Sequence, residues 1–166
     1  MNILITGAAG FIGFHLSKKI LQKGHKVFGV DDLNDYYEVK LKKDRLKKLS
    51  EYSNFFFKKT SISNYGSLKN IFKKNDISHV INLAAYAGVR HSIKKPQDYI
   101  DANITGFNNI LRLSEESKLK HLIYASSSSV YGTNTKIPFH EDDNVDHPVS
   151  LYGATKKSNE LMAHCY

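Results

Sequence analysis

A tyrosine and a lysine stand one helical turn apart near the end of the chain, at Tyr152 and Lys156 in the run SLYGATK. Residues with this spacing are neighbours on a helix, so the ammonium would lie beside the phenol. The reference pKa of tyrosine is ~10, and a nearby cation favours the phenolate. The pair is therefore a candidate general base with its activating lysine. In isolation the same spacing is also typical of an amphipathic helix with a snorkelling lysine.

A run of serines, ASSSSVYG at residues 125–132, precedes this pair. It follows the apolar segment 121–127, which we expect to form a strand, and open α/β sheets bind ligands at the carboxyl ends of their strands. Side chains alternate along a strand, so Ser127 and Ser129 are predicted to point to the same side. A polar loop containing Pro and Asp can then return the chain so that Ser127 lies near Tyr152.

Three glycines, Gly7, Gly10 and Gly13, lie in TGAAGFIG between an apolar segment and an amphipathic one. A tight turn, close backbone approach to a pyrophosphate and a free helix N-terminus all favour glycine at such a place. Asp31 ends the next apolar segment, where a dinucleotide-binding fold places the carboxylate that accepts hydrogen bonds from the adenosine ribose. That carboxylate favours NAD over NADP. Asp32 leaves the assignment open by one position, and we choose Asp31.

The elements needed to position these residues alternate along the chain. Strands are predicted at 2–6, 26–30, 54–59, 79–85 and 121–127, and helices at 11–24, 40–49, 65–75, 99–117 and 151–166. Apolar strands that alternate with helices predict an α/β protein, a Rossmann-type doubly wound parallel sheet. In the basic helix 40–49 we expect Leu41, Leu46 and Leu49 to face inward and the lysines to face outward.

The composition is that of one globular domain, because 166 residues with 41% hydrophobic and 24% charged residues can bury a single core. The net charge of +8 is explained by the solvated face of helix 40–49, so we infer no nucleic-acid partner. No apolar run is long enough to cross a bilayer, and no secretory leader is recognisable, so we infer no membrane partner. The single cysteine, Cys165, excludes an internal disulfide and a Cys-rich zinc site, no metal is expected, and the profile is cytoplasmic.

Together these residues resemble the extended branch of the short-chain dehydrogenase/reductase family. Within that branch, NDYY, AGVRHS, ASSSSVYG and DHPVSLYGATKKSNELMAH are similar to nucleotide-sugar epimerases that act on UDP-glucuronate at C4. The resemblance implies that Ser127, Tyr152 and Lys156 are the catalytic group. It implies NAD as cofactor, bound by Gly7, Gly10, Phe11, Ile12, Gly13, Asp31, Ser61, Ile62, Ala84, Tyr152 and Lys156. It also implies that the substrate is bound by Arg90, Asn103, Ser128 and Ser129.

The implied reaction is epimerisation of UDP-glucuronate to UDP-galacturonate through a 4-keto intermediate, in a homodimer. Two positions depart from the family pattern: Ser61 before Ile62 stands where an aspartate is frequent, and Asn82 where a histidine is frequent. Relatives are considerably longer, so residues 1–166 are expected to be the NAD-binding domain, truncated before the C-terminal substrate-binding part. A UDP-glucose 4-epimerase, a nucleotide-sugar dehydratase or decarboxylase, and an inactive NAD-binding fragment remain as alternatives.

Overall fold

The computed structural model describes residues 1–166 and contains one sheet of five parallel strands. The strands are β1 (Asn2–Thr6), β2 (Lys26–Asp31), β3 (Phe55–Lys59), β4 (His79–Asn82) and β5 (His121–Tyr124), in the order β3-β2-β1-β4-β5. β1 is central, with Ile5 opposite Gly29 of β2 and Ile81 of β4. The strand order reverses between β1 and β4, which is where open α/β sheets bind ligands. The predicted Rossmann-type doubly wound sheet is thus confirmed.

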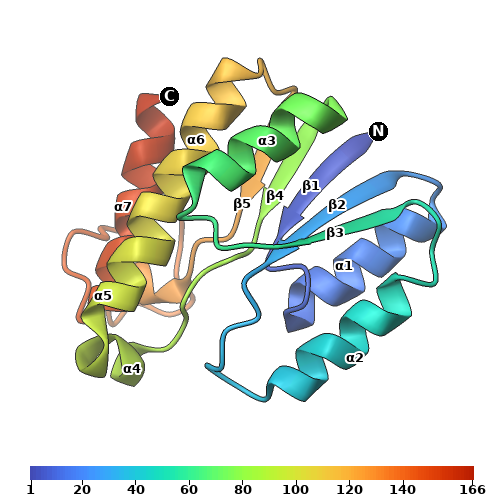
Figure 1. Cartoon of the computed structure of the whole chain (residues 1–166). Coiled ribbons are helices and arrows are strands. Elements are labelled where there is room, and N and C mark those ends of the chain that lie inside the picture. The colour runs from blue at the N-terminus through green and yellow to red at the C-terminus, as the bar shows by residue number, and fades with distance from the viewer.

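Helices cover both faces of this sheet (Figure 1). α1 (Phe11–Gln22) and α2 (Val39–Leu49) lie on one face, over a core that includes Ile5, Phe14 and Leu49. α3 (Tyr65–Asn75) and α6 (Phe107–Glu116) lie on the other, over a core that includes Leu68 and Ile110. β1 and β2 are buried along nearly their whole length and read as apolar runs, which is why the sequence pattern identified them, whereas the edge strands β3 and β5 contain no buried residue.

The predicted helix 99–117 is interrupted, which corrects the prediction of a single helix. α5 (Pro96–Tyr99) leads into a π-helical turn, η1 (Ile100–Gly106), before α6 begins. A short helix that was not predicted, α4 (Val89–Lys94), precedes α5. The residues of η1 are all compatible with an α-helix, so the sequence carries no signal for the wider turn.

Two strands end earlier than predicted. β4 ends at Asn82 because the next two amides, of Leu83 and Ala84, donate to the Thr6 hydroxyl, each at 3.1 Å. β5 ends at Tyr124, and the serine run continues into a short 3₁₀ helix, η2 (Ser128–Tyr131). Except for Ala125, whose amide still donates to the Asn82 carbonyl at 3.2 Å, the residues after both strands leave the sheet at its carboxyl edge.

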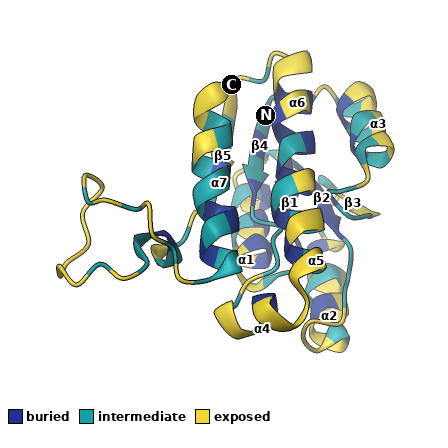
Figure 2. Ribbon diagram, turned by 90° about the vertical axis from the view of Figure 1, so that its left-hand side faces the viewer, coloured by how far each residue is buried: buried dark blue, intermediate teal, exposed yellow.

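The last helix, α7 (Leu151–Cys165), begins at the N-cap Ser150, whose hydroxyl accepts from the Gly153 amide at 3.0 Å. Between η2 and α7 the chain makes a long excursion that projects from the body of the molecule and is mostly exposed (Figure 2). Tyr131 and Phe139 stack at its base, with ring centroids 4.4 Å apart. None of the helices has the length and apolar character needed to span a bilayer.

Candidate active site

The glycine loop after β1 is shaped by positions at which a side chain does not fit. Gly7 has a φ of +68°, and a Cβ there would lie 2.9 Å from the Ala84 amide nitrogen. A Cβ at Gly13 would overlap the Gly7 carbonyl oxygen, so Gly13 lets α1 pack directly on the turn. Gly10 is the N-cap of α1 and offers no side-chain cap. The first amides of α1 are therefore left for an anion, as a dinucleotide pyrophosphate requires.

Phe11 and Ile12, predicted as cofactor contacts, form the first turn of α1 with side chains that are 68% and 61% exposed. In this position they offer a ligand their backbone N–H groups. No acidic side chain lies in the first turn of α1 to compete with an anion for these groups. Gly7 and Gly10 line the adjoining pocket together with Asp31, and Gly13 lies beneath them.

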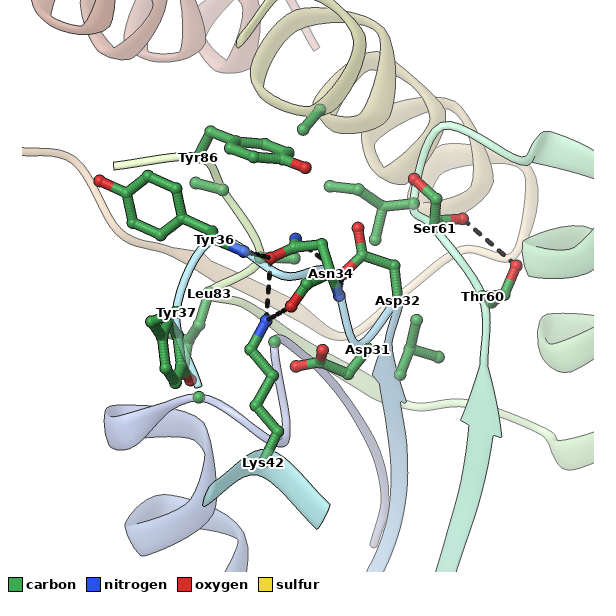
Figure 3. A pocket seen from close by; sticks show the side chains of 17 residues that line it. Asp31, Asp32, Asn34, Tyr36, Tyr37, Lys42, Thr60, Ser61, Leu83 and Tyr86 are labelled. Atoms are coloured by element: carbon green, nitrogen blue, oxygen red, sulfur yellow. Dashed lines mark hydrogen bonds between the residues drawn. The ribbon is translucent and has the colours of Figure 1, made fainter. Parts of the chain in front are cut away.

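Asp31 is buried at the end of β2 and connects two backbone segments (Figure 3). One carboxylate oxygen accepts from the Ala9 amide of the glycine loop at 3.1 Å, and the other accepts from the Leu33 amide at 2.9 Å. Burial raises the pKa of this carboxyl above its usual value. The two amides and the nearby Lys42 ammonium lower it, but they offset only part of the rise. Asp32 also lines the pocket, but its carboxylate accepts from the amide and side chain of Asn34.

Lys42 lines the same pocket and was missed by the sequence analysis, which expected the lysines of its helix to face outward. It is only 4% exposed, and its ammonium donates to the Asn34 carbonyl and side-chain oxygens at 2.8 and 2.9 Å. The inward face of α2 is thus Lys42, Leu46 and Leu49, while Leu41 is 44% exposed. The helical spacing of residues 42, 46 and 49 indicates this face, but a lysine between leucines carries no sequence signal that it is buried.

The far wall of the pocket comes from the segments that follow β3 and β4. Ser61 and Ile62 lie there, with the Ser61 hydroxyl 2.8 Å from that of Ser63. Ala84 lies opposite them, held by the Thr6 hydroxyl. Six of the predicted cofactor residues, from the ends of four strands, therefore line one cavity: Gly7, Gly10, Asp31, Ser61, Ile62 and Ala84.

The lysine of the opening pair lies behind the serine run. Lys156 is 5% exposed, and its ammonium donates to the Ala125 carbonyl at 2.9 Å. Burial lowers its pKa from 10.5 to about 8. Tyr152 is half-buried one turn earlier, with its ring edge-on to Tyr99 at a centroid separation of 6.2 Å. Gly153 places the start of α7 directly against η2, because a Cβ there would lie 2.6 Å from the Ser129 carbonyl oxygen.

Ser127 is the N-cap of η2, and its hydroxyl accepts from the Ser129 amide at 3.2 Å. This corrects the prediction that Ser127 and Ser129 point to the same side of a strand, because β5 ends at Tyr124 and the chain enters η2 at Ser128. Ser128 is exposed and Ser129 is half-buried. Arg90 is exposed on α4, a helix that packs against α7.

Asn103, which is predicted to bind the substrate, lies buried beside the helix that carries Tyr152 and Lys156. It is 2% exposed, and its side chain accepts from the Tyr86 amide at 2.9 Å and donates to the Tyr86 carbonyl at 3.0 Å and the Thr155 hydroxyl at 3.1 Å. The backbone carbonyl of Asn103 accepts a hydrogen bond from the Asn159 side-chain amide at 2.6 Å. Asn103 therefore fastens the segment after β4 to the helix that carries Tyr152 and Lys156, and both N–H groups of its side-chain amide are donated to protein oxygens.

Known proteins are similar to this chain in sequence and in fold. The model of the GDP-mannose 4,6 dehydratase family matches residues 4–166. Protein CapI of Staphylococcus aureus is 59% identical over 166 residues, and the UDP-glucuronate 4-epimerase of Thermodesulfobacterium geofontis is 48% identical over 163. These matches cover 100% and 98% of this chain but 49% and 50% of the relatives, so the chain spans about half their length. The UDP-glucuronic acid 4-epimerase of Bacillus cereus, crystallised with UDP-glucuronic acid and NAD, superposes with a TM-score of 0.92 at 38% identity, over 100% of this chain and 52% of that one.

Proposed function

We propose, from the premise that this chain belongs to the GDP-mannose 4,6 dehydratase family, that it forms the cofactor-binding half of an NAD-dependent UDP-sugar 4-epimerase. The observation that carries the proposal is the convergence of the glycine loop, Asp31 and the Tyr152–Lys156 pair on the carboxyl edge of one parallel sheet. The relatives named above as epimerases support the same reaction.

The residues present fit a dinucleotide. The turn at Gly7 and Gly10 has no room for side chains, and the uncapped start of α1 provides amides for the pyrophosphate. Asp31 keeps lone pairs for the ribose hydroxyls and would repel a 2′-phosphate, which favours NAD over NADP. The chemistry that NAD supplies when bound is reversible hydride acceptance, which lets C4 of the sugar be oxidised and then reduced on its other face.

In this reaction Tyr152 takes the proton from the 4-hydroxyl and later returns it, assisted by the Ser127 hydroxyl. The charge on Lys156 stabilises the Tyr152 phenolate, and a lysine with a pKa of about 8 is mostly protonated at neutral pH. The neighbouring Tyr99 is unsuited to the role. Burial raises its pKa to about 12, and its hydroxyl lies 2.6 Å from the Ala87 carbonyl oxygen.

UDP-glucuronate is the proposed substrate, with UDP-galacturonate as product. Arg90 and Ser128 are exposed beside α7 and η2, and a carboxylate is best held by a cation and several donors. The name of the GDP-mannose 4,6 dehydratase family raises a dehydratase as the alternative. Elimination needs a second acid–base pair near the sugar, and the serine run offers hydroxyls there, which disfavours it. UDP-glucose is the alternative within 4-epimerases.

The complete enzyme is proposed to be a cytoplasmic homodimer. An apolar strip on η1 and α7 supports the dimer: Ile100 is 37% exposed and Leu161 57% exposed, and both line one shallow groove with Ile104 and Met162. A second copy of α7 packed on this strip would remove these side chains from water. The exposed, unpaired Cys165 is compatible with a reducing compartment.

The test is to incubate the purified chain, and in parallel a chain extended by the segment that its relatives possess, with NAD and either UDP-glucuronate or UDP-glucose. We expect the extended chain to form UDP-galacturonate faster than UDP-galactose, and Tyr152→Phe to lower its turnover by roughly 10²–10⁴-fold. Residues 1–166 alone should bind NAD weakly and form no product. Faster conversion of UDP-glucose would contradict the substrate assignment, and wild-type turnover in Tyr152→Phe would contradict the catalytic one.

A further inference from the structure

Two loops that are distant in the sequence meet at Tyr36. This residue lies between β2 and α2 and lines the same pocket as Asp31 (Figure 3). Its hydroxyl donates to the carbonyl of Ala87 at 2.7 Å. Ala87 belongs to the segment after β4 that leads into Arg90. A single hydrogen bond therefore joins the loop beside the proposed ribose site to the segment that carries the proposed sugar-binding arginine.

The packing around this bond leaves little freedom. The Tyr36 ring is edge-on to Tyr86 and to His91, with centroid separations of 5.9 and 4.9 Å. Gly88 has a φ of +93°, and a Cβ there would lie 2.7 Å from the Tyr36 hydroxyl oxygen. The tight approach explains why a glycine stands at this position.

The same segment is tied to the catalytic helix from its other side. The Tyr99 hydroxyl lies 2.6 and 2.8 Å from the Ala87 and Gly88 carbonyl oxygens, and Asn103 links Tyr86 to Thr155 of α7. Residues 86–88 are thus held between the α7 side and the loop that carries Tyr36. Loss of the Tyr36 bond would leave the contacts to α7 in place and weaken the cofactor side, which the ring contacts of residue 36 alone would then hold.

We propose that Tyr36 is a positioning residue that couples the cofactor loop (residues 32–37) to the sugar segment (residues 86–91). NAD bound against the cofactor loop then also restrains the segment that carries Arg90 before the sugar binds. The coupling rests on the proposed function for the identity of both ligands, whereas the contact itself rests on the hydrogen bond between Tyr36 and Ala87.

Limited digestion with an arginine-specific protease tests the contact, because the chain contains only Arg45, Arg90 and Arg112. Tyr36→Phe removes one oxygen and should raise the cleavage rate at Arg90 by roughly 2–12-fold, the change in local opening for one lost hydrogen bond. Cleavage at Arg112, on α6, should be unchanged. The matched control is Tyr37→Phe, since the Tyr37 hydroxyl accepts from Arg45 at 3.2 Å and does not reach the sugar segment.

Repeating the digestion with saturating NAD tests the coupling, with calorimetry on each variant to confirm binding. NAD should slow cleavage at Arg90 in the wild type and in Tyr37→Phe, and should lose most of this effect in Tyr36→Phe. Gly88→Ala, whose Cβ displaces the Tyr36 hydroxyl, should behave like Tyr36→Phe. Equal cleavage at Arg90 in the two tyrosine variants would overturn the inference. A wild-type chain that binds no NAD would overturn the proposed cofactor and the coupling to it. The digestion without NAD would still show whether the Tyr36 hydrogen bond restrains the segment that carries Arg90.

Discussion

Lys156 holds a charge where water barely reaches, and this has a measurable cost in stability. The residue is 5% exposed, and its ammonium has one acceptor, the Ala125 carbonyl. Burial lowers its pKa from 10.5 to about 8. At about 1.4 kcal/mol per pH unit, this corresponds to about 3 kcal/mol by which folding disfavours the charged lysine. Replacing the charge with an apolar group should therefore stabilise the chain.

Lys156→Met keeps most of the apolar stem and removes the ammonium. We expect the free energy of unfolding at pH 7 to rise by about 2 kcal/mol, since the Ala125 carbonyl loses a partner at a cost of about 1 kcal/mol. The gain depends on pH. Between pH 8 and 10.5 the unfolded wild type holds a proton that the folded wild type has released, so wild-type stability rises with pH. By pH 9.5 the advantage of Lys156→Met should have fallen by about 2 kcal/mol.

Urea unfolding of the wild type and Lys156→Met at pH 7.0 and 9.5 measures this difference. Lys157→Met is the matched control, because Lys157 is the next residue of α7 and forms a surface pair with Glu160 at 3.6 Å. Its effect should stay within about 1 kcal/mol at pH 7. A Lys156→Met chain that is less stable than the wild type at pH 7, or a gap that is equal at both pH values, would refute the reasoning.

Three further predictions concern the cofactor pocket and its support. Asp31→Ala should weaken NAD binding by at least tenfold and remove the preference over NADP in calorimetric titrations, because the ribose acceptor and the bond to Ala9 are both lost; an unchanged NAD affinity would exclude the role. Gly7→Ala should lower stability by about 2–4 kcal/mol in urea, whereas Gly24→Ala, at a φ of +79° with open space around it, should cost about 1 kcal/mol; equal losses would mean that the contact with Ala84 is unimportant. Asn103→Ala should cost about 2–4 kcal/mol by leaving the Tyr86 backbone groups unpaired, and a loss below about 0.5 kcal/mol would refute its bridging role.

The sequence predicted the elements whose hydrophobic pattern is simple. The strand at 2–6 and the helix at 65–75 have the predicted bounds, and the parallel sheet followed from the apolar strands. It could not predict features that depend on contacts between distant segments. The π turn around Asn103 forms where its side chain meets Tyr86 and Thr155, and nothing within residues 99–117 indicates those partners. Likewise β4 ends early because Thr6, on another strand, captures the next amides.

The same reasoning explains why the candidate site was predicted as residue types and not as geometry. The glycine spacing identifies the turn because the φ of +68° at Gly7 and the contact of Gly13 with Gly7 are local constraints. The bond between Ser127 and the Ser129 amide, in contrast, requires knowing that the strand has ended. Lys42 is the clearest case. Its burial depends on the Asn34 oxygens, which a loop of the preceding segment presents to it.

The two buried lysines of the site have a feature in common that packing does not explain. Lys42 and Lys156 each donate to neutral oxygens, and neither lies within 4.0 Å of a carboxylate oxygen. A buried cation without a direct counter-ion is costly, and an apolar residue of similar size would be more stable. Both lie at the carboxyl edge of the sheet, Lys42 beside Asp31 and Lys156 behind Ser127. The Lys42 ammonium still interacts electrostatically with Asp31, whose pKa it lowers, whereas burial alone shifts the pKa of Lys156. Under the proposed function, these two charges act on groups that are negative at this edge, an anionic cofactor and the Tyr152 phenolate, at the expense of stability.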